Sequence, residues 1–148
     1  MSDPYDLQRF VEAQDRVYHQ VVTELRAGHK TSHWMWFIFP QVAGLGSSPM
    51  AQRFAIQSRA EASAYLDHPV LGARLRECTQ LVLDVQERDI SDIFGYPDDL
   101  KFHSSMTLFA LADGAPRLFD AALGQYFNAE PDVKTLDLLG YDSRSRSG

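Results

Sequence analysis

The sequence predicts an all-α fold, a compact multi-helical single domain of about six or seven helices, and three observations lead to this prediction. Apolar residues recur at spacings of three and four along most of the chain, as on one face of an α-helix. No segment shows the alternation of apolar and polar residues that marks a half-buried strand. Proline, glycine and aspartate divide the chain into segments of helical length. We expect one helical domain over residues 1–140 and a disordered polar tail over residues 141–148.

The first predicted helix begins at Asp3 and Pro4 and ends near Gly28. Asp3 suits the N-cap position, and Pro4 suits the first helical position. Apolar residues then follow one face at helical spacing, and Gln14 alone interrupts them. This segment is the clearest amphipathic helix in the chain.

Six consecutive apolar residues, Trp34 to Phe39, form the longest apolar run. A segment of this kind is buried whether it is a helix or a strand. Periodicity alone leaves both open, but a short central helix is favoured because the surrounding sequence is helical. Pro40 ends the run. We expect these six residues to form the middle of the core.

The remaining elements follow from caps and breakers. Ser48 and Pro49 restart the chain after a loop, and Ser58 is expected to cap a helix that ends at Asp67 to Pro69. Among the acidic residues, Glu61 is the one singled out, because it lies in that alanine-rich helix, where a carboxylate can point inward. Later helices are expected over residues 70–85, 97–113, 116–127 and 133–139, with one helical turn near residues 91–94.

Composition excludes several classes of function. The chain has 20 acidic residues and 14 lysines and arginines, and its net charge of -6 disfavours nucleic acid or an anionic membrane as a partner. The single cysteine, Cys78, allows no internal disulfide, and the N-terminus lacks a signal peptide, so a cytoplasmic location is expected. The apolar run is far shorter than the ~20 residues of a membrane-spanning helix. No spacing of cysteine and histidine indicates a metal, and no cofactor is expected.

The loop after the apolar run is the first candidate for a binding site. Gly44 and Gly46 permit positive φ, and Ser47 leads into a helix start, so backbone N–H groups there can cradle an anion. The pattern lacks the third glycine of a dinucleotide fingerprint and the Gly-Lys-Ser/Thr of a Walker loop. The alternative is a flexible turn between two helices.

His33 and the two tryptophans flank this loop. His33 is expected to be partly exposed, because residues 30–32 before it are polar, and it is a candidate general acid or base. A structural role at a helix start is the alternative. Trp34 or Trp36 can stack on a planar ligand such as a base, although the run as a whole is expected to be core.

The segment 97–109 is the second candidate. Asp98, Lys101 and Ser105 share one face of the predicted helix, and a lysine beside acidic groups can bind a phosphate or a carboxylate. The alternative is a solvated ion pair, with Ser104 and Ser105 bonded to backbone carbonyl groups.

Five segments together resemble a bacterial family catalogued as domain of unknown function 1810, sometimes mislabelled calpastatin-like. They are RFVEAQ, ELRAGHKTSHWMWFIFPQVAGLGSS, EASAYLDHPVLGARLRE, IFGYPDDLKFHSSMTLF and TLDLL, and the resemblance runs from about Leu7 to Leu139. It implies a compact, mostly helical domain with no established activity. The characteristic polar positions of the family correspond to Lys30, His33, Gln41, Ser47, Asp98, Lys101 and Ser104. More weakly, the family is similar to helical proteins of ADP-ribose metabolism.

Two functions are consistent with these residues, and the sequence leaves open whether the protein is an enzyme. The first is binding or hydrolysis of a small anionic ligand, of the nucleotide or ADP-ribose type, with His33 as the catalytic candidate. Its ligand-binding candidates are Lys30, Trp34, Trp36, Gln41, Gly44, Gly46, Ser47, Asp98, Lys101 and Ser104. The second is a non-catalytic helical module that binds another protein or its own copy as a homo-oligomer. The first function requires Lys30, His33, Gln41 and Lys101 to converge on one concavity.

Overall fold

The computed structural model describes residues 3–141, so the predicted tail lies outside the described residues except for Tyr141. Within this range the chain forms helices and no strand, which confirms the all-α prediction. The helices are α1 (Gln8–Asp15), α2 (Tyr18–Arg26), α3 (Met35–Ile38), α4 (Pro49–Arg53), α5 (Arg59–Asp67), α6 (Leu71–Leu83), α7 (Ile90–Phe94), α8 (Asp98–Ala110), α9 (Leu118–Phe127) and α10 (Val133–Leu138). The predicted number of six or seven is wrong, because the first predicted helix is two helices and the connecting segments contain short helices of their own.

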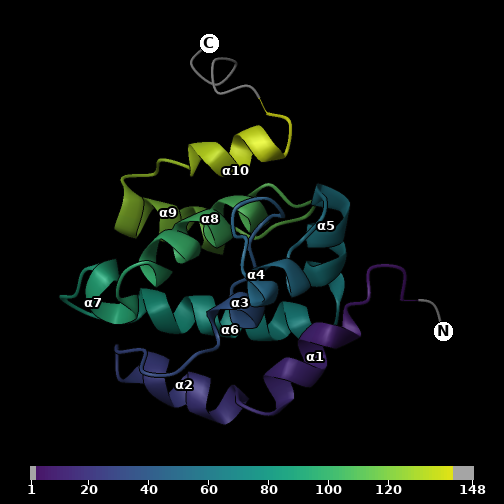
Figure 1. Ribbon diagram of the computed structural model, residues 1–148. Coiled ribbons are helices and arrows are strands. Elements are labelled where there is room, and N and C mark those ends of the chain that lie inside the picture. The colour runs from purple at the N-terminus through teal and green to yellow at the C-terminus, as the bar shows by residue number, and fades with distance from the viewer. Residues whose placement is uncertain (1–2, 142–148) are drawn as a thin grey trace.

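Helix α6 lies between α2 and the layer formed by α8 and α9 (Figure 1). Helix α2 contacts α6 on one side, α9 contacts it on another, and α5 forms a hairpin with it. Helix α8 packs against α9, α5 and α7, while α10 covers α8 on the side away from α1 and α2. The short α3 is enclosed between α1 and α6, so the apolar run is central, as predicted.

The first predicted helix is divided at Arg16 and Val17, where Val17 has φ -132° and ψ 0°. The reason lies in tertiary contacts of Gln14, the polar residue on the apolar face. Its side chain is 1 % exposed, and its amide nitrogen donates to the Phe37 carbonyl at 2.8 Å and to the Tyr65 hydroxyl at 3.0 Å. These bonds direct α1 toward α3 and α5, while α2 turns to pack on α6. A single straight helix in place of α1 and α2 could make only one of these two sets of contacts.

The apolar run forms a short helix and supplies a cluster of aromatic rings to the core. Phe39 meets Phe102 edge to face at a centroid distance of 5.0 Å and Phe94 at 5.8 Å. Phe94 and Phe102 stack at 5.0 Å, and Trp34 lies 6.4 Å from Phe94. Aromatic pairs at these distances add to the free energy of area burial. The cluster therefore fixes α3 against α7 and α8, which carry the second candidate segment.

The predicted cap at Ser58 is confirmed, and Ser48, where the chain was expected to restart, is the N-cap of α4. The prediction of Asp3 as the cap of the first helix is wrong, because α1 begins at Gln8 with Leu7 at the N-cap position. The hydroxyl of Ser48 accepts a hydrogen bond from the Ala51 backbone nitrogen, and that of Ser58 accepts one from the Glu61 nitrogen, both at 3.1 Å. Glu61 points inward, with 2 % of its surface exposed, and forms an ion pair with Arg9 at 3.0 Å. A buried carboxylate needs such a partner, because desolvation of an unpaired charge is costly.

The packing of Gly72 in the hairpin between α5 and α6 predicts that alanine at this position lowers stability, whereas alanine at Gly124 in α9 does not. A Cβ atom at Gly72 would lie 2.0 Å from the Leu66 carbonyl oxygen, a backbone atom that cannot move without shifting α5. Gly72→Ala should therefore lower the free energy of unfolding by about 2–3 kcal/mol. Gly124→Ala in α9 is the control, since a Cβ there meets nothing within 4 Å. It should raise stability by about 0.5–1 kcal/mol through helix propensity. Urea unfolding of both variants measures the difference, and equal effects would contradict the packing described.

Candidate functional site

A surface cavity of about 360 Å³ lies where the segment before α3 meets the start of α8. The backbone N–H of Lys30 donates to the Ile93 carbonyl at 2.7 Å, which joins the first segment to α7, the helix before α8. The cavity is lined by Lys30, Thr31, Ser32, His33, Met35, Trp36, Tyr96, Pro97, Asp98 and Lys101. Five of these were predicted as site residues: Lys30, His33, Trp36, Asp98 and Lys101. Segments sixty or more positions apart in the sequence therefore share one concavity, which we call the lysine cavity.

Asp98 bridges the two lysines of the cavity. One carboxylate oxygen lies 2.7 Å from the Lys30 Nζ, and the other lies 3.4 Å from the Lys101 Nζ. The Lys30 side chain is 6 % exposed and the Lys101 side chain 25 %. Lys30 also donates to the Ser32 carbonyl at 2.5 Å and lies over the Trp34 ring. Lys101 has the longer ion pair and the greater exposure, so it is the cation more accessible to a ligand.

The buried carboxylate of Glu24 fixes the wall of the cavity, and the sequence analysis did not identify it. One oxygen accepts the backbone N–H groups of Thr31 and Ser32 at 2.8 and 3.1 Å and the Trp34 indole N–H at 3.0 Å. The other accepts the Ser32 hydroxyl at 2.6 Å. Burial raises the pKa of Glu24, but these hydrogen bonds outweigh it, led by the one from Ser32, and lower the pKa to about 2. The sequence does contain a signal for this buried carboxylate. Glu24 follows Val21 by three positions and so lies on the apolar face of the predicted helix, where a charged residue is rare.

The two tryptophans have opposite environments. Trp34 is 1 % exposed and its indole nitrogen is bonded to Glu24, so its ring belongs to the core and offers no face to a ligand. This corrects the prediction that Trp34 could stack on a ligand. Trp36 is half-buried and lines the lysine cavity, with the Lys101 Nζ 5.3 Å from its ring centroid. His33 is exposed at the same cavity and has no hydrogen-bond partner within residues 3–141.

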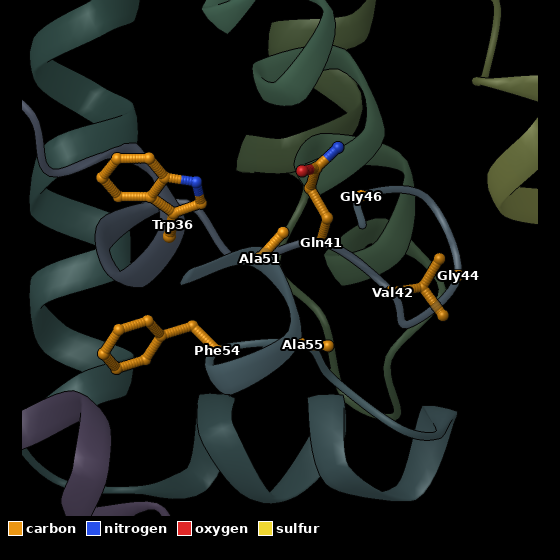
Figure 2. A pocket seen from close by; sticks show the side chains of 8 residues that line it. All are labelled: Trp36, Gln41, Val42, Gly44, Gly46, Ala51, Phe54 and Ala55. Atoms are coloured by element: carbon orange, nitrogen blue, oxygen red, sulfur yellow. The ribbon is translucent and has the colours of Figure 1, made fainter. Parts of the chain in front are cut away.

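Three other predicted residues lie around a second, smaller hollow, which Trp36 also lines. Figure 2 shows Trp36 and Phe54 on one side of this hollow and Val42 and Gly44 on the other. Its volume of about 10 Å³ is enough for one water molecule and too small for a phosphate. Gln41 and Gly46 also line it. These residues therefore do not meet Lys30 and Lys101 in one concavity. Trp36 is the residue that lines both spaces.

Packing accounts for the glycines and the amide of this loop. Gly44 has φ +103°, and a Cβ at Gly46 would lie 2.6 Å from the Ala51 Cβ. The Gln41 side-chain nitrogen donates to the Ser104 hydroxyl at 2.8 Å, and that hydroxyl donates to the Leu100 carbonyl at 3.0 Å. Ser47 is exposed and its carbonyl accepts the Gln52 side chain. An anion-holding role for this loop stays a prediction.

Over residues 3–141, no helix is both long and apolar enough to cross a membrane. In the same part of the chain, no three side chains of His, Cys, Asp or Glu are grouped to hold a metal ion.

Comparison with known proteins gives one family and one solved structure. Residues 4–139 match the model of a family described as "Protein of unknown function (DUF1810)". The crystal structure of the conserved hypothetical protein Rv1873 from Mycobacterium tuberculosis is 58 % identical in sequence and superposes with a TM-score of 0.92. The similarity covers 95 % of this chain and 100 % of that one. No curated protein matches the sequence.

The Glu24 contacts predict a pH-dependent stability. A carboxylate whose pKa is lowered on folding, here from 4.5 to about 2, stabilises the fold fully above pH 4.5. The contribution is lost as the pH falls toward 2, and about 3 kcal/mol is the expected order of magnitude. Glu24→Gln should therefore destabilise strongly at pH 6, and this difference from wild type should shrink between pH 4.5 and 2.

Urea unfolding from pH 2 to 7 measures the effect, with exposed Glu12→Gln as the control. The control should change stability by less than ~0.5 kcal/mol at pH 6. A destabilisation by Glu24→Gln that does not vary with pH would show that packing, and not the charge, is lost.

Proposed function

Because this chain belongs to the DUF1810 family of proteins of unknown function, we propose its function from the geometry of the lysine cavity. We propose that the cavity binds a small anionic ligand of the nucleotide or ADP-ribose type. The observation that carries the proposal is the convergence of Lys30, His33, Trp36 and Lys101 on one space of about 360 Å³. Concave sites of 300–1,000 Å³ with a few polar groups and an aromatic wall are typical of small-molecule binding.

The charges of the cavity support an anion as the ligand. Lys30 and Lys101 carry two positive charges and Asp98 one negative charge, so the group has a net charge of +1 within a protein of net charge -6. Lys30 is held by Asp98, Ser32 and the Trp34 ring, and it acts as a fixed part of the wall. In our proposal a ligand phosphate or carboxylate approaches Lys101 and competes with Asp98 for its ammonium group.

His33 has the position expected of an acid or base acting on a ligand in this cavity. It is exposed, it lines the cavity, and no hydrogen bond within the described residues restrains its ring. Histidine is the side chain that most often exchanges protons with a reacting group. We therefore propose His33 as the proton-transferring residue of a hydrolytic reaction on the bound ligand.

The alternative function, a non-catalytic interaction module, requires the polar residues to lie on unrelated faces. Lys30, His33 and Lys101 instead line one cavity, which favours a small ligand. Gln41 departs from this pattern, because it lines the smaller hollow and is bonded to Ser104.

A thermal-shift panel of phosphate, sugar phosphates, nucleotides, NAD and ADP-ribose tests the proposal. A ligand at 100 times its Kd should stabilise the protein by about 2.7 kcal/mol, a shift of about 5–10 °C in Tm. Lys101→Met should abolish most of the shift. Lys134→Met on α10 is the matched control, because Lys134 is exposed and outside the cavity, and it should keep the shift. Equal losses in both variants, or no shift with any anion, would rule out the lysine cavity as the site.

Asp98→Asn gives the opposite prediction for the same cavity. The substitution removes the internal competitor for Lys101 and keeps the size of the side chain. Affinity for the anion found in the panel should rise by about 10-fold, which corresponds to roughly 1.4 kcal/mol. Isothermal titration of wild type and variant measures the change. Weaker binding would mean that Asp98 contacts the ligand or is needed to hold Lys30 in place, and the competition model would then be wrong.

A further inference from the structure

Tyr96 is an exposed aromatic side chain at the rim of the lysine cavity that the sequence analysis did not identify. Its exposure of 81 % is the highest of the large hydrophobic side chains within residues 3–141. Single exposed hydrophobic residues are common and need no explanation. Tyr96 differs because it lines the same cavity as Trp36, His33 and Lys101. The Tyr96 ring comes from the segment between α7 and α8, whereas the Trp36 ring comes from α3.

The cavity thus has an aromatic side chain from each of its two segments and an accessible cation, Lys101, in its lining. Trp36 belongs to α3, and the Lys101 Nζ lies 5.3 Å from its ring centroid. A flat aromatic group in the cavity would cover the exposed Tyr96 ring and remove apolar surface from water. Stacking of a base on one aromatic side chain commonly strengthens binding by about 5- to 150-fold, and it tolerates different bases because each has a π-face.

We propose that the ligand of the lysine cavity is a nucleoside monophosphate, with its base against Tyr96 and its phosphate at Lys101. This inference rests on the proposed function and makes it more specific. The cavity volume of about 360 Å³ is at the lower end of the range for ligand sites and favours a mononucleotide over the larger ADP-ribose. Trp36 forms the inner wall, and Tyr96 is the positioning residue that selects ligands with a ring over simple sugar phosphates.

The experiment compares AMP, ribose 5-phosphate and ADP-ribose on wild type and on three variants by isothermal titration. Tyr96→Ala should weaken AMP binding by about 10-fold and change ribose 5-phosphate binding by less than about 2-fold. Tyr96→Phe should bind AMP as wild type does, since it keeps the ring. Leu100→Ala is the matched control: Leu100 is also an exposed apolar residue, at 53 %, but does not line the cavity. It should leave AMP binding unchanged.

A spectroscopic measurement gives an independent test. The protein has two tryptophans, and Trp34 is buried and bonded to Glu24. A base in the cavity should therefore quench the emission of Trp36 and leave a blue-shifted component from Trp34. Ribose 5-phosphate, which has no ring, should not quench. Trp36→Phe identifies the component, because the quenching should disappear in that variant.

The outcomes separate this inference from the proposed function. If AMP and ribose 5-phosphate bind equally and Tyr96→Ala affects neither, the aromatic inference is wrong and anion binding at Lys101 stands. If ADP-ribose binds more than about 10-fold tighter than AMP, the choice of a mononucleotide is overturned. If Leu100→Ala weakens AMP as much as Tyr96→Ala, the loss reflects the apolar rim and the role of Tyr96 is overturned. If none of the three compounds binds, both proposals fail.

Discussion

The arrangement of the lysine cavity depends on one buried carboxylate, that of Glu24. Residues 30–34 have no regular secondary structure, so no helical ladder fixes their backbone. Glu24 on α2 supplies the missing partners by accepting two backbone N–H groups, a hydroxyl and an indole N–H. Hydrogen bonds to a charged acceptor are stronger than those between neutral groups. The irregular segment is therefore held by a contact from another helix, and the cavity wall depends on that contact.

The orientation of the two tryptophans follows from the same contact. The bond to Glu24 draws the Trp34 ring into the core beside Phe94 and Phe39. Trp36, two positions later in a helical turn, then points away from the core side occupied by Trp34. It lines both the lysine cavity and the small hollow of Figure 2. A core contact thus determines which aromatic face is left for a ligand, and a site held by a rigid core is well suited to precise binding.

Local sequence signals predicted those parts of the molecule that local interactions determine. The cap at Ser58 and the helix start at Ser48 depend on bonds within one helical turn, and both positions were predicted correctly. The break after Gln14 was missed because its cause is a set of bonds to Phe37 and Tyr65, which lie 23 and 51 positions away. Neither proline nor glycine marks that break.

The same distinction applies to the candidate site. Lys30 and His33 were identified because polar residues beside an apolar run are conspicuous, and Lys101 because it shares a helical face with Asp98. The structure places all three in one cavity. Tyr96 lies in a connector without periodicity, so nothing in its sequence context distinguished it from a solvated residue. Trp34 and Trp36 could not be told apart, because the choice between core and cavity depends on a hydrogen bond from a different helix.

In our proposal, the ion group of the cavity is what lets a protein of net charge -6 hold an anion. Its overall field repels anions at long range, and at physiological salt this repulsion is screened beyond about 8 Å. Attraction must therefore come from groups in direct contact with the ligand. Asp98 keeps Lys30 and Lys101 together in the absence of a ligand, since two ammonium groups at one site repel each other. It also lowers the attraction for simple anions, so a ligand needs a second source of binding free energy, and the aromatic side chains of Trp36 and Tyr96 are placed to supply it.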